Sequence, residues 1–218
     1  MRRRRIVLML SLAISFLAGG ARGDVAFSLS GDQDGIKEFR LAIGDYYRVP
    51  ETQVTVIRER QIPDEELPVV FFLAQRAKVS PDIIVNMRLG GKSWMDITYY
   101  YGMGADIYYV PVKTVNGPPY GKAYGYYKNR PKKEWKYIKL ADDDVINLVD
   151  LRFISSHYGH PPDEVIKMRS DGKSFMAINK DFKENKGKHT IEKSEKSKSS
   201  KSSKGQKSSL KSKDKKRK

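Results

Sequence analysis

The chain has 218 residues, no cysteine and a formal net charge of +16. The lack of cysteine excludes a disulfide framework and a lipid-attachment cysteine. The charge is unevenly divided: residues 1–23 and 183–218 carry the whole excess, and residues 24–182 are neutral overall. This neutral body, with roughly 160 residues, is long enough to form a hydrophobic core.

The N-terminus has the three parts of a secretory signal peptide. Arg2 to Arg5 are followed by an apolar run, Ile6 to Gly20, and by the small-residue site Ala21-Arg22-Gly23. We therefore expect residues 1–23 to be cleaved on export to the periplasm or cell envelope, with no membrane-spanning segment in the mature chain. An uncleaved anchor is the weaker interpretation, because the run has 15 residues and a spanning helix needs about 20.

A 17-residue pattern occurs twice. Pro81–Ile97, PDIIVNMRLGGKSWMDI, recurs 81 residues later as Pro162–Ile178, PDEVIKMRSDGKSFMAI, with nine identical positions. Ser80 before the first proline is typical of a helix start, and the Gly-containing turn in each copy is typical of a helix end. Ser93 and Ser174 then stand where they can cap a second helix.

The repeat predicts a mainly α-helical protein. Apolar periodicity adds a helix before each copy, which gives two tandem trihelical units of the order helix, turn, helix, turn, helix. The first unit, helical repeat 1, spans 63–102, and the second, helical repeat 2, spans 141–182. We expect a further helical region over 24–62, where a fainter copy is discernible with its apolar register shifted by one residue.

The segment between the two units differs in character, and we call residues 103–140 the connector. We expect a strand over Ile107–Val115, which Gly117-Pro118-Pro119 interrupts. Eight bases against two acids give the connector a net charge of +6. Aromatic rings that alternate with cations stack on sugars or bases and hold anionic groups. The candidate binding residues are Tyr124, Tyr126, Tyr127, Lys128, Arg130, Lys132, Lys133 and Trp135.

Two interpretations of the connector stay open. Its rings form a ligand surface, or its tyrosines pack a Gly-rich loop over the helices. The Lys/Ser-rich tail, residues 183–218, is also ambiguous: we expect it to be disordered, acting either as an arm for anionic polymers or as a solubilising extension.

No pattern in the sequence predicts catalysis, a metal site or a cofactor. Gly91-Lys92-Ser93 resembles the end of a phosphate-binding loop, but Asn86 occupies the place of that loop's first glycine. His157 and His160 lie three residues apart, but there is no cysteine, and the remaining histidine, His189, lies in the tail. A metal site would need carboxylates such as Asp150 or Asp163. We therefore predict that the protein is not an enzyme.

The chain carries two resemblances to known proteins. Met87-Arg88, Gly91 and Ser93-Trp94, with Ile97, resemble the helix-turn-helix of resolvase-type and sigma-factor-type DNA-binding domains. From Val49 to Lys180 the chain resembles a group of exported bacterial proteins of unassigned function. The stretches that carry this second resemblance include IPDEELPVVFFLAQRA, SPDIIVNMRLGGKSWMDI, GPPYGKAYGYYK and INLVDLRFISSHYG.

The second resemblance implies the envelope of a Gram-negative cell and no known activity. The leading hypothesis is a binding or scaffold protein of the envelope that contacts an anionic polymer, or another envelope protein, through the connector and tail. The alternative is a nucleic-acid-binding protein that uses the paired helix-turn-helix units and the basic tail.

Overall fold

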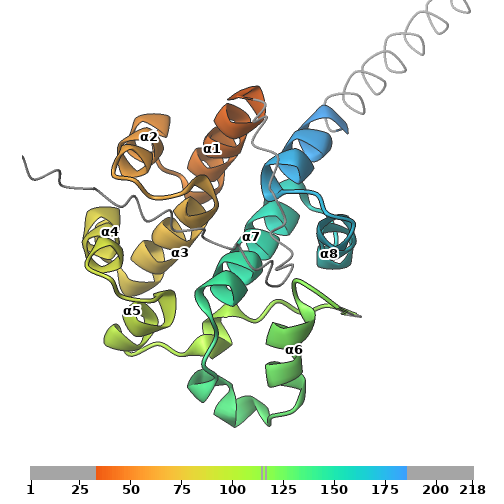
Figure 1. The fold of residues 1–218 in the computed structure, drawn as a ribbon. Helices are drawn as coiled ribbons and strands as arrows, with labels where there is room; N and C mark the ends of the chain where they lie inside the picture. Colours follow the sequence, from red (N-terminus) through yellow and green to blue (C-terminus); the bar gives the residue numbers. More distant parts are fainter. Residues whose placement is uncertain (1–32, 114, 116, 186–218) are drawn as a thin grey trace, which may run out of the picture. The chain divides into compact units, whose positions relative to one another are not determined.

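The polypeptide between Gln33 and Asn185 is built almost entirely from helices (Figure 1). The computed structural model describes residues 33–113, 115 and 117–185, and all of them belong to one compact unit. The predicted signal peptide lies outside the described residues. So does the predicted tail, apart from residues 183–185, which are helical.

The prediction of a mainly α protein is confirmed. The α-helices are α1 (Gln33–Tyr47), α2 (Glu51–Glu59), α3 (Leu67–Ala77), α4 (Pro81–Leu89), α5 (Trp94–Tyr100), α6 (Gly121–Lys128), α7 (Asp142–Tyr158) and α8 (Pro162–Ser170). Residues 175–185 are also helical. Short 3₁₀ helices are η1 (Asp64–Glu66), η2 (Ala105–Tyr108) and η3 (Lys132–Tyr137).

Helices α3 and α7 lie side by side in the middle of this unit (Figure 1). Every residue from Leu67 to Ala74 is buried, because other helices cover α3 on all sides. Phe39 of α1 packs edge-on against Phe153 of α7, with 5.6 Å between ring centroids. Helix α4 packs against α3, and α8 packs against α7. The two central helices therefore organise the core around which the candidate sites form.

Helices α4 and α5, and the helix over residues 175–185, start after the serines that the sequence predicted as caps. Helix α6 was not predicted. The Ser80 hydroxyl accepts a hydrogen bond from the Asp82 amide at the start of α4. Ser93 and Asp96 exchange hydrogen bonds in a capping box at the start of α5. In the second copy the Ser174 hydroxyl caps the amide of Ala177, which cannot return the bond. These hydrogen bonds satisfy amides that have no partner within their helices.

The turns after α4 and α8 need a residue that tolerates positive φ. Gly91 and Gly172 occupy these places with φ of 86° and 91°. Gln61 follows α2 with φ of 66°, although it is not a glycine. The fainter N-terminal copy thus makes its turn with a residue type that sequence patterns do not associate with positive φ.

Corresponding arginines of the two sequence copies make corresponding contacts. Each guanidinium donates to the carbonyl four residues later and lies over the aromatic ring six residues later. In the first copy, Arg88 donates to Lys92 O at 3.3 Å and lies 4.6 Å from the ring centroid of Trp94. In the second copy, Arg169 donates to Lys173 O at 2.7 Å and lies 4.4 Å from the ring centroid of Phe175.

The charged partners of these arginines differ. Arg88 forms salt bridges with Glu66 and with Asp142. Arg169 donates instead to the side-chain oxygen of Asn147, the residue that corresponds to Glu66, and forms no salt bridge within the described residues. Within the described residues, one arginine therefore forms salt bridges with two acids, and its counterpart forms none.

The predicted strand over Ile107–Val115 is wrong. Its first residues belong to η2, residues 109–113 belong to no helix or strand, and no β-strand occurs among the described residues. The reason is that side chains take backbone carbonyls that a sheet would use: Tyr109 O accepts from Arg152, and Val110 O accepts from Tyr124. The β-branched and aromatic residues of this stretch pack on helices instead of on a second strand.

Candidate functional site

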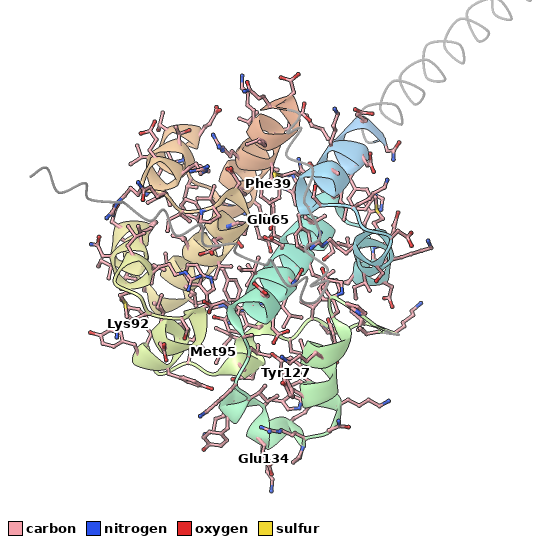
Figure 2. The ribbon with its side chains drawn as sticks, viewed as in Figure 1. Phe39, Glu65, Lys92, Met95, Tyr127 and Glu134 are labelled. Carbon is pink, nitrogen blue, oxygen red and sulfur yellow. The ribbon has the colours of Figure 1, made fainter. Side chains whose placement is uncertain are left out.

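Two of the predicted binding tyrosines are part of the core. The Tyr124 hydroxyl donates to Val110 O and the Tyr127 hydroxyl to Ala105 O, both at 2.6 Å. Both rings are buried, and burial raises the pKa of each phenol above its ordinary value. These tyrosines hold α6 against η2 and against Val110, which follows η2. In Figure 2, Tyr127 lies on the inner side of the connector, and Glu134 lies at its outer edge.

Trp135 lies at the boundary between this aromatic cluster and the surface. Its ring centroid is 4.4 Å from that of Tyr109 and 5.2 Å from that of Tyr127. The indole N–H donates to Tyr127 O and to Arg130 O, each at 3.0 Å. The ring is half-buried, so one part of it packs inward while another part stays exposed.

The predicted cations remain on the surface. Lys128, Arg130, Lys132 and Lys133 are exposed, and the ammonium of Lys132 lies 5.8 Å from the ring centroid of Trp135. Tyr126 is half-buried beside them.

A hollow of about 530 Å³ adjoins this segment. It is lined by Tyr109, Lys113, Tyr124, Tyr127, Lys128 and Trp135, together with small residues of α6 and the apolar side chains of residues 112 and 115. It combines aromatic walls with two lysines at its edge. Part of the predicted set, Tyr124, Tyr127, Lys128 and Trp135, is therefore brought together around one hollow, while Arg130, Lys132 and Lys133 lie outside its lining.

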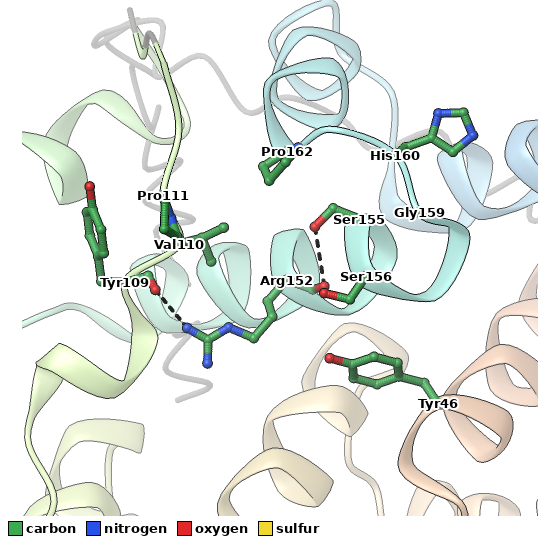
Figure 3. Close-up of a pocket in the computed structure, with 10 residues that line it drawn as sticks. All are labelled: Tyr46, Tyr109, Val110, Pro111, Arg152, Ser155, Ser156, Gly159, His160 and Pro162. Carbon is green, nitrogen blue, oxygen red and sulfur yellow. Dashed lines mark hydrogen bonds between the residues drawn. The ribbon is translucent and has the colours of Figure 1, made fainter.

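A second hollow, of about 540 Å³, lies between the connector and α7 (Figure 3). Tyr46, Tyr109, Arg152 and His160 are among the residues that line it. The guanidinium of Arg152 reaches from α7 towards the connector and donates to Tyr109 O at 2.8 Å. Tyr109 lines both hollows, so they are neighbours along one face.

His157 and His160 have contacts within the fold. His157 stands edge-on to Tyr158, with 4.6 Å between ring centroids. His160 stacks on Phe182 at 3.9 Å, and its Nδ1 is hydrogen-bonded to Glu164 at 2.8 Å. Over the stretches that the structure describes, no group of three or more His, Asp or Glu side chains is placed to hold a metal ion.

A buried polar cluster between η1, α7 and α8 was not predicted from the sequence. Asp150 is completely buried, and neither of its carboxyl oxygens has a hydrogen-bond partner in the described part of the chain. Burial, together with the nearby Glu65 carboxyl, raises the pKa of Asp150 well above its usual range. Burial also raises the pKa of Glu65. The guanidinium of Arg169 opposes both pKa shifts, because it is the nearby positive charge.

Helix α5 bears on the nucleic-acid alternative, because it corresponds to the second helix of a helix-turn-helix. Its exposed aromatic residues are Tyr99 and Tyr100, and the helix has no basic residue. The Tyr99 hydroxyl donates to Ile138 O in the connector, and the Thr98 hydroxyl is buried against Tyr108. This face of α5 is therefore turned partly towards the connector and offers no cation to a phosphate backbone.

Within the described ranges, no helix combines the length and the apolar character needed to cross a bilayer. Comparisons with protein-family models, with curated proteins and with solved structures found no match to this chain.

Proposed function

We propose that this chain is an exported, non-enzymatic binding or scaffold protein of the cell envelope that holds an anionic polymer. Its body consists of two tandem trihelical units, residues 63–102 and 141–182, joined by the connector. The polymer is of the class of lipopolysaccharide, peptidoglycan or an acidic extracellular polysaccharide. The basic tail, residues 183–218, adds affinity without selectivity.

The observation that carries the proposal is the unpaired charge of the connector. None of its eight bases forms a salt bridge within the described residues. By contrast, Arg40, Arg58 and Arg88 are each held by a carboxylate. A cluster of exposed cations is self-repelling, and a negatively charged polymer relieves that repulsion when it binds.

The aromatic part of the connector supports a sugar-containing polymer. Tyr109 and Trp135 line the same hollow as Lys113 and Lys128, so ring faces and ammonium groups meet at one place. Aromatic rings stack on the apolar faces of sugars, and cations beside them pair with carboxylate or phosphate groups. The arrangement therefore suits an acidic polysaccharide better than a featureless polyanion.

The test compares two charge-matched triple variants of the full chain. In the first, Lys128, Lys132 and Lys133 are changed to Gln; in the second, Lys37, Lys92 and Lys167, which are also exposed, are changed to Gln. Lys167 has an exposed salt bridge, whose loss costs little. Retention is measured by electrophoresis through gels that contain polygalacturonate or neutral dextran, at several salt concentrations.

We expect the connector variant to lose most of its retention by polygalacturonate, while the control variant behaves like the natural chain. The slope of binding against salt should also fall in the connector variant, because fewer counterions are released. Equal retention of the two variants would mean that the tail or the net charge alone binds the polymer, and the proposal would be abandoned.

A further inference from the structure

Two guanidiniums, those of Arg76 in α3 and Arg152 in α7, lie over one aromatic ring. Their central carbons are 5.1 Å and 5.2 Å from the ring centroid of Phe72. Neither arginine forms a salt bridge in the part of the chain that the structure describes. Two positive groups are thus gathered on one aromatic side chain without a carboxylate to balance them.

Arg152 is half-buried beside a like charge and has no salt bridge within the described residues. Burial lowers the pKa of Arg152, and the neighbouring charge of Arg76 lowers it further. Within the described residues, the one side-chain hydrogen bond that Arg152 donates goes to Tyr109 O, a neutral acceptor. Arg76 is exposed and has no hydrogen bond to a described residue. Most of the ten N–H groups of the pair are therefore free to meet a ligand.

The space around the pair is hollow and free of acids. A hollow of about 480 Å³ is lined by Tyr46, Tyr47, Phe72, Gln75, Arg76 and Arg152. It shares Tyr46 and Arg152 with the hollow of Figure 3, whose lining adds Ser155 and Ser156. The Ser155 hydroxyl is buried and donates to Leu151 O, whereas Ser156 is exposed. Neither lining contains Asp or Glu. Together the two linings contain both guanidiniums, several aromatic rings and the hydroxyl of Ser156.

We infer that Arg76 and Arg152 form a discrete binding site for an oxyanion, a carboxylate or a phosphate, carried on a sugar ring. Guanidinium groups bind both oxyanions through paired N–H donors. The ring of Tyr46 provides an apolar face for the sugar, and Ser156, which is exposed, provides a hydroxyl for its polar edge. This inference rests on the proposed function in one respect: it gives the same polymer a selective site apart from the connector cations.

The site is tested with small ligands, which the connector and the tail hold only weakly at 150 mM salt. The full chain is titrated calorimetrically with trigalacturonate, with glucose 6-phosphate and with neutral maltotriose. Arg76→Gln is the main variant, since Arg76 is exposed and its loss leaves the core intact. Arg60→Gln is the matched control, because Arg60 lies at the C-terminal end of α2 and pairs with Asp82. Arg152→Lys is the second variant, which keeps the charge and removes the planar donor pair.

We expect one of the two acidic ligands to bind, and its identity assigns the oxyanion. Arg76→Gln should weaken that binding by about tenfold or more, because a charge-assisted hydrogen bond is lost. Arg152→Lys should weaken it as well, with the melting temperature used to confirm folding, and Arg60→Gln should leave it unchanged. Binding of neither acidic ligand, equal binding of maltotriose, or unchanged binding by Arg76→Gln would overturn the inference.

The two proposals fail separately. Loss of polygalacturonate retention in the connector variant, together with unchanged small-ligand binding by Arg76→Gln, refutes only the discrete site. The opposite pattern refutes only the connector as the polymer surface.

Discussion

The replacement of Asp150 by Val should remove a pH dependence from the stability of this protein. Asp150 is completely buried, and both of its carboxyl oxygens lack hydrogen-bond partners within the described residues. In the first sequence copy the corresponding residue is Val69, which is also completely buried. The corresponding buried position of the first copy therefore already accommodates a valine side chain.

The sign of the effect follows from the raised pKa of Asp150 in the folded chain. In the unfolded chain this carboxyl loses its proton near its ordinary pKa of about 3.9. Between that pH and the higher folded pKa, the folded chain holds one proton more than the unfolded chain. Stability consequently falls as pH rises through this window, by about 1.4 kcal/mol for each pH unit.

The assay is urea unfolding of the natural chain and of Asp150→Val at each pH unit from 4 to 8. The difference in unfolding free energy should be small at pH 4 and should grow in favour of the variant as pH rises. Asp150→Asn, which keeps a polar group without a titrating proton, should lose the same pH dependence but gain less stability. A difference that stays constant from pH 4 to pH 8 would refute the reasoning.

Two further predictions concern side chains whose partners the structure identifies. Changing Arg88 to Met should lower the free energy of unfolding by about 2–4 kcal/mol, because two partly buried carboxylates lose their guanidinium. The measurement is thermal unfolding, with Arg60→Met as the control because Arg60 forms an exposed salt bridge with Asp82. Equal losses of stability in the two variants would contradict the prediction. Changing Tyr127 to Phe should cost about 1–3 kcal/mol, because the buried carbonyl of Ala105 loses its donor. Tyr126→Phe is the matched control, and urea unfolding should show it to be near neutral.

The helix boundaries were predictable because their signals are local. Ser80, Ser93 and Ser174 cap helices through hydrogen bonds to amides two or three residues away. Gly91 makes its turn through its own backbone freedom. In each case the residues that decide the structure are neighbours in the sequence, so the pattern predicts the contact.

The strand and the sites depend on distant residues and were not predictable in the same way. Residues 107–115 have a strand-like composition, but the chain provides no partner strand among the described residues, and composition cannot show this. The Glu65 carboxyl raises the pKa of Asp150 across 85 positions of sequence. Arg76 and Arg152 meet at Phe72 only because α3 and α7 pack together.

For the candidate binding residues the sequence predicted position better than role. It placed the aromatic and basic residues in one segment, and the structure divides that segment in two. Tyr124 and Tyr127 point inward and hold backbone carbonyls, whereas Lys128 and Lys133 stay at the surface. Helical spacing places Tyr124 and Tyr127 on one face of α6, but the sequence does not show that this face packs inward.

The contacts of Asp142 determine what a break in the connector would do to the fold. Its carboxylate accepts from the Trp94 amide at the start of α5 and pairs with Arg88, so the first residue of α7 is fastened to the end of α4 and the beginning of α5. The connector between these helices therefore forms a loop whose two ends are held close together. A break in its exposed part, between Asn129 and Lys133, leaves this fastening intact on both sides. The length of this exposed basic stretch can therefore change without separating α7 from α4 and α5.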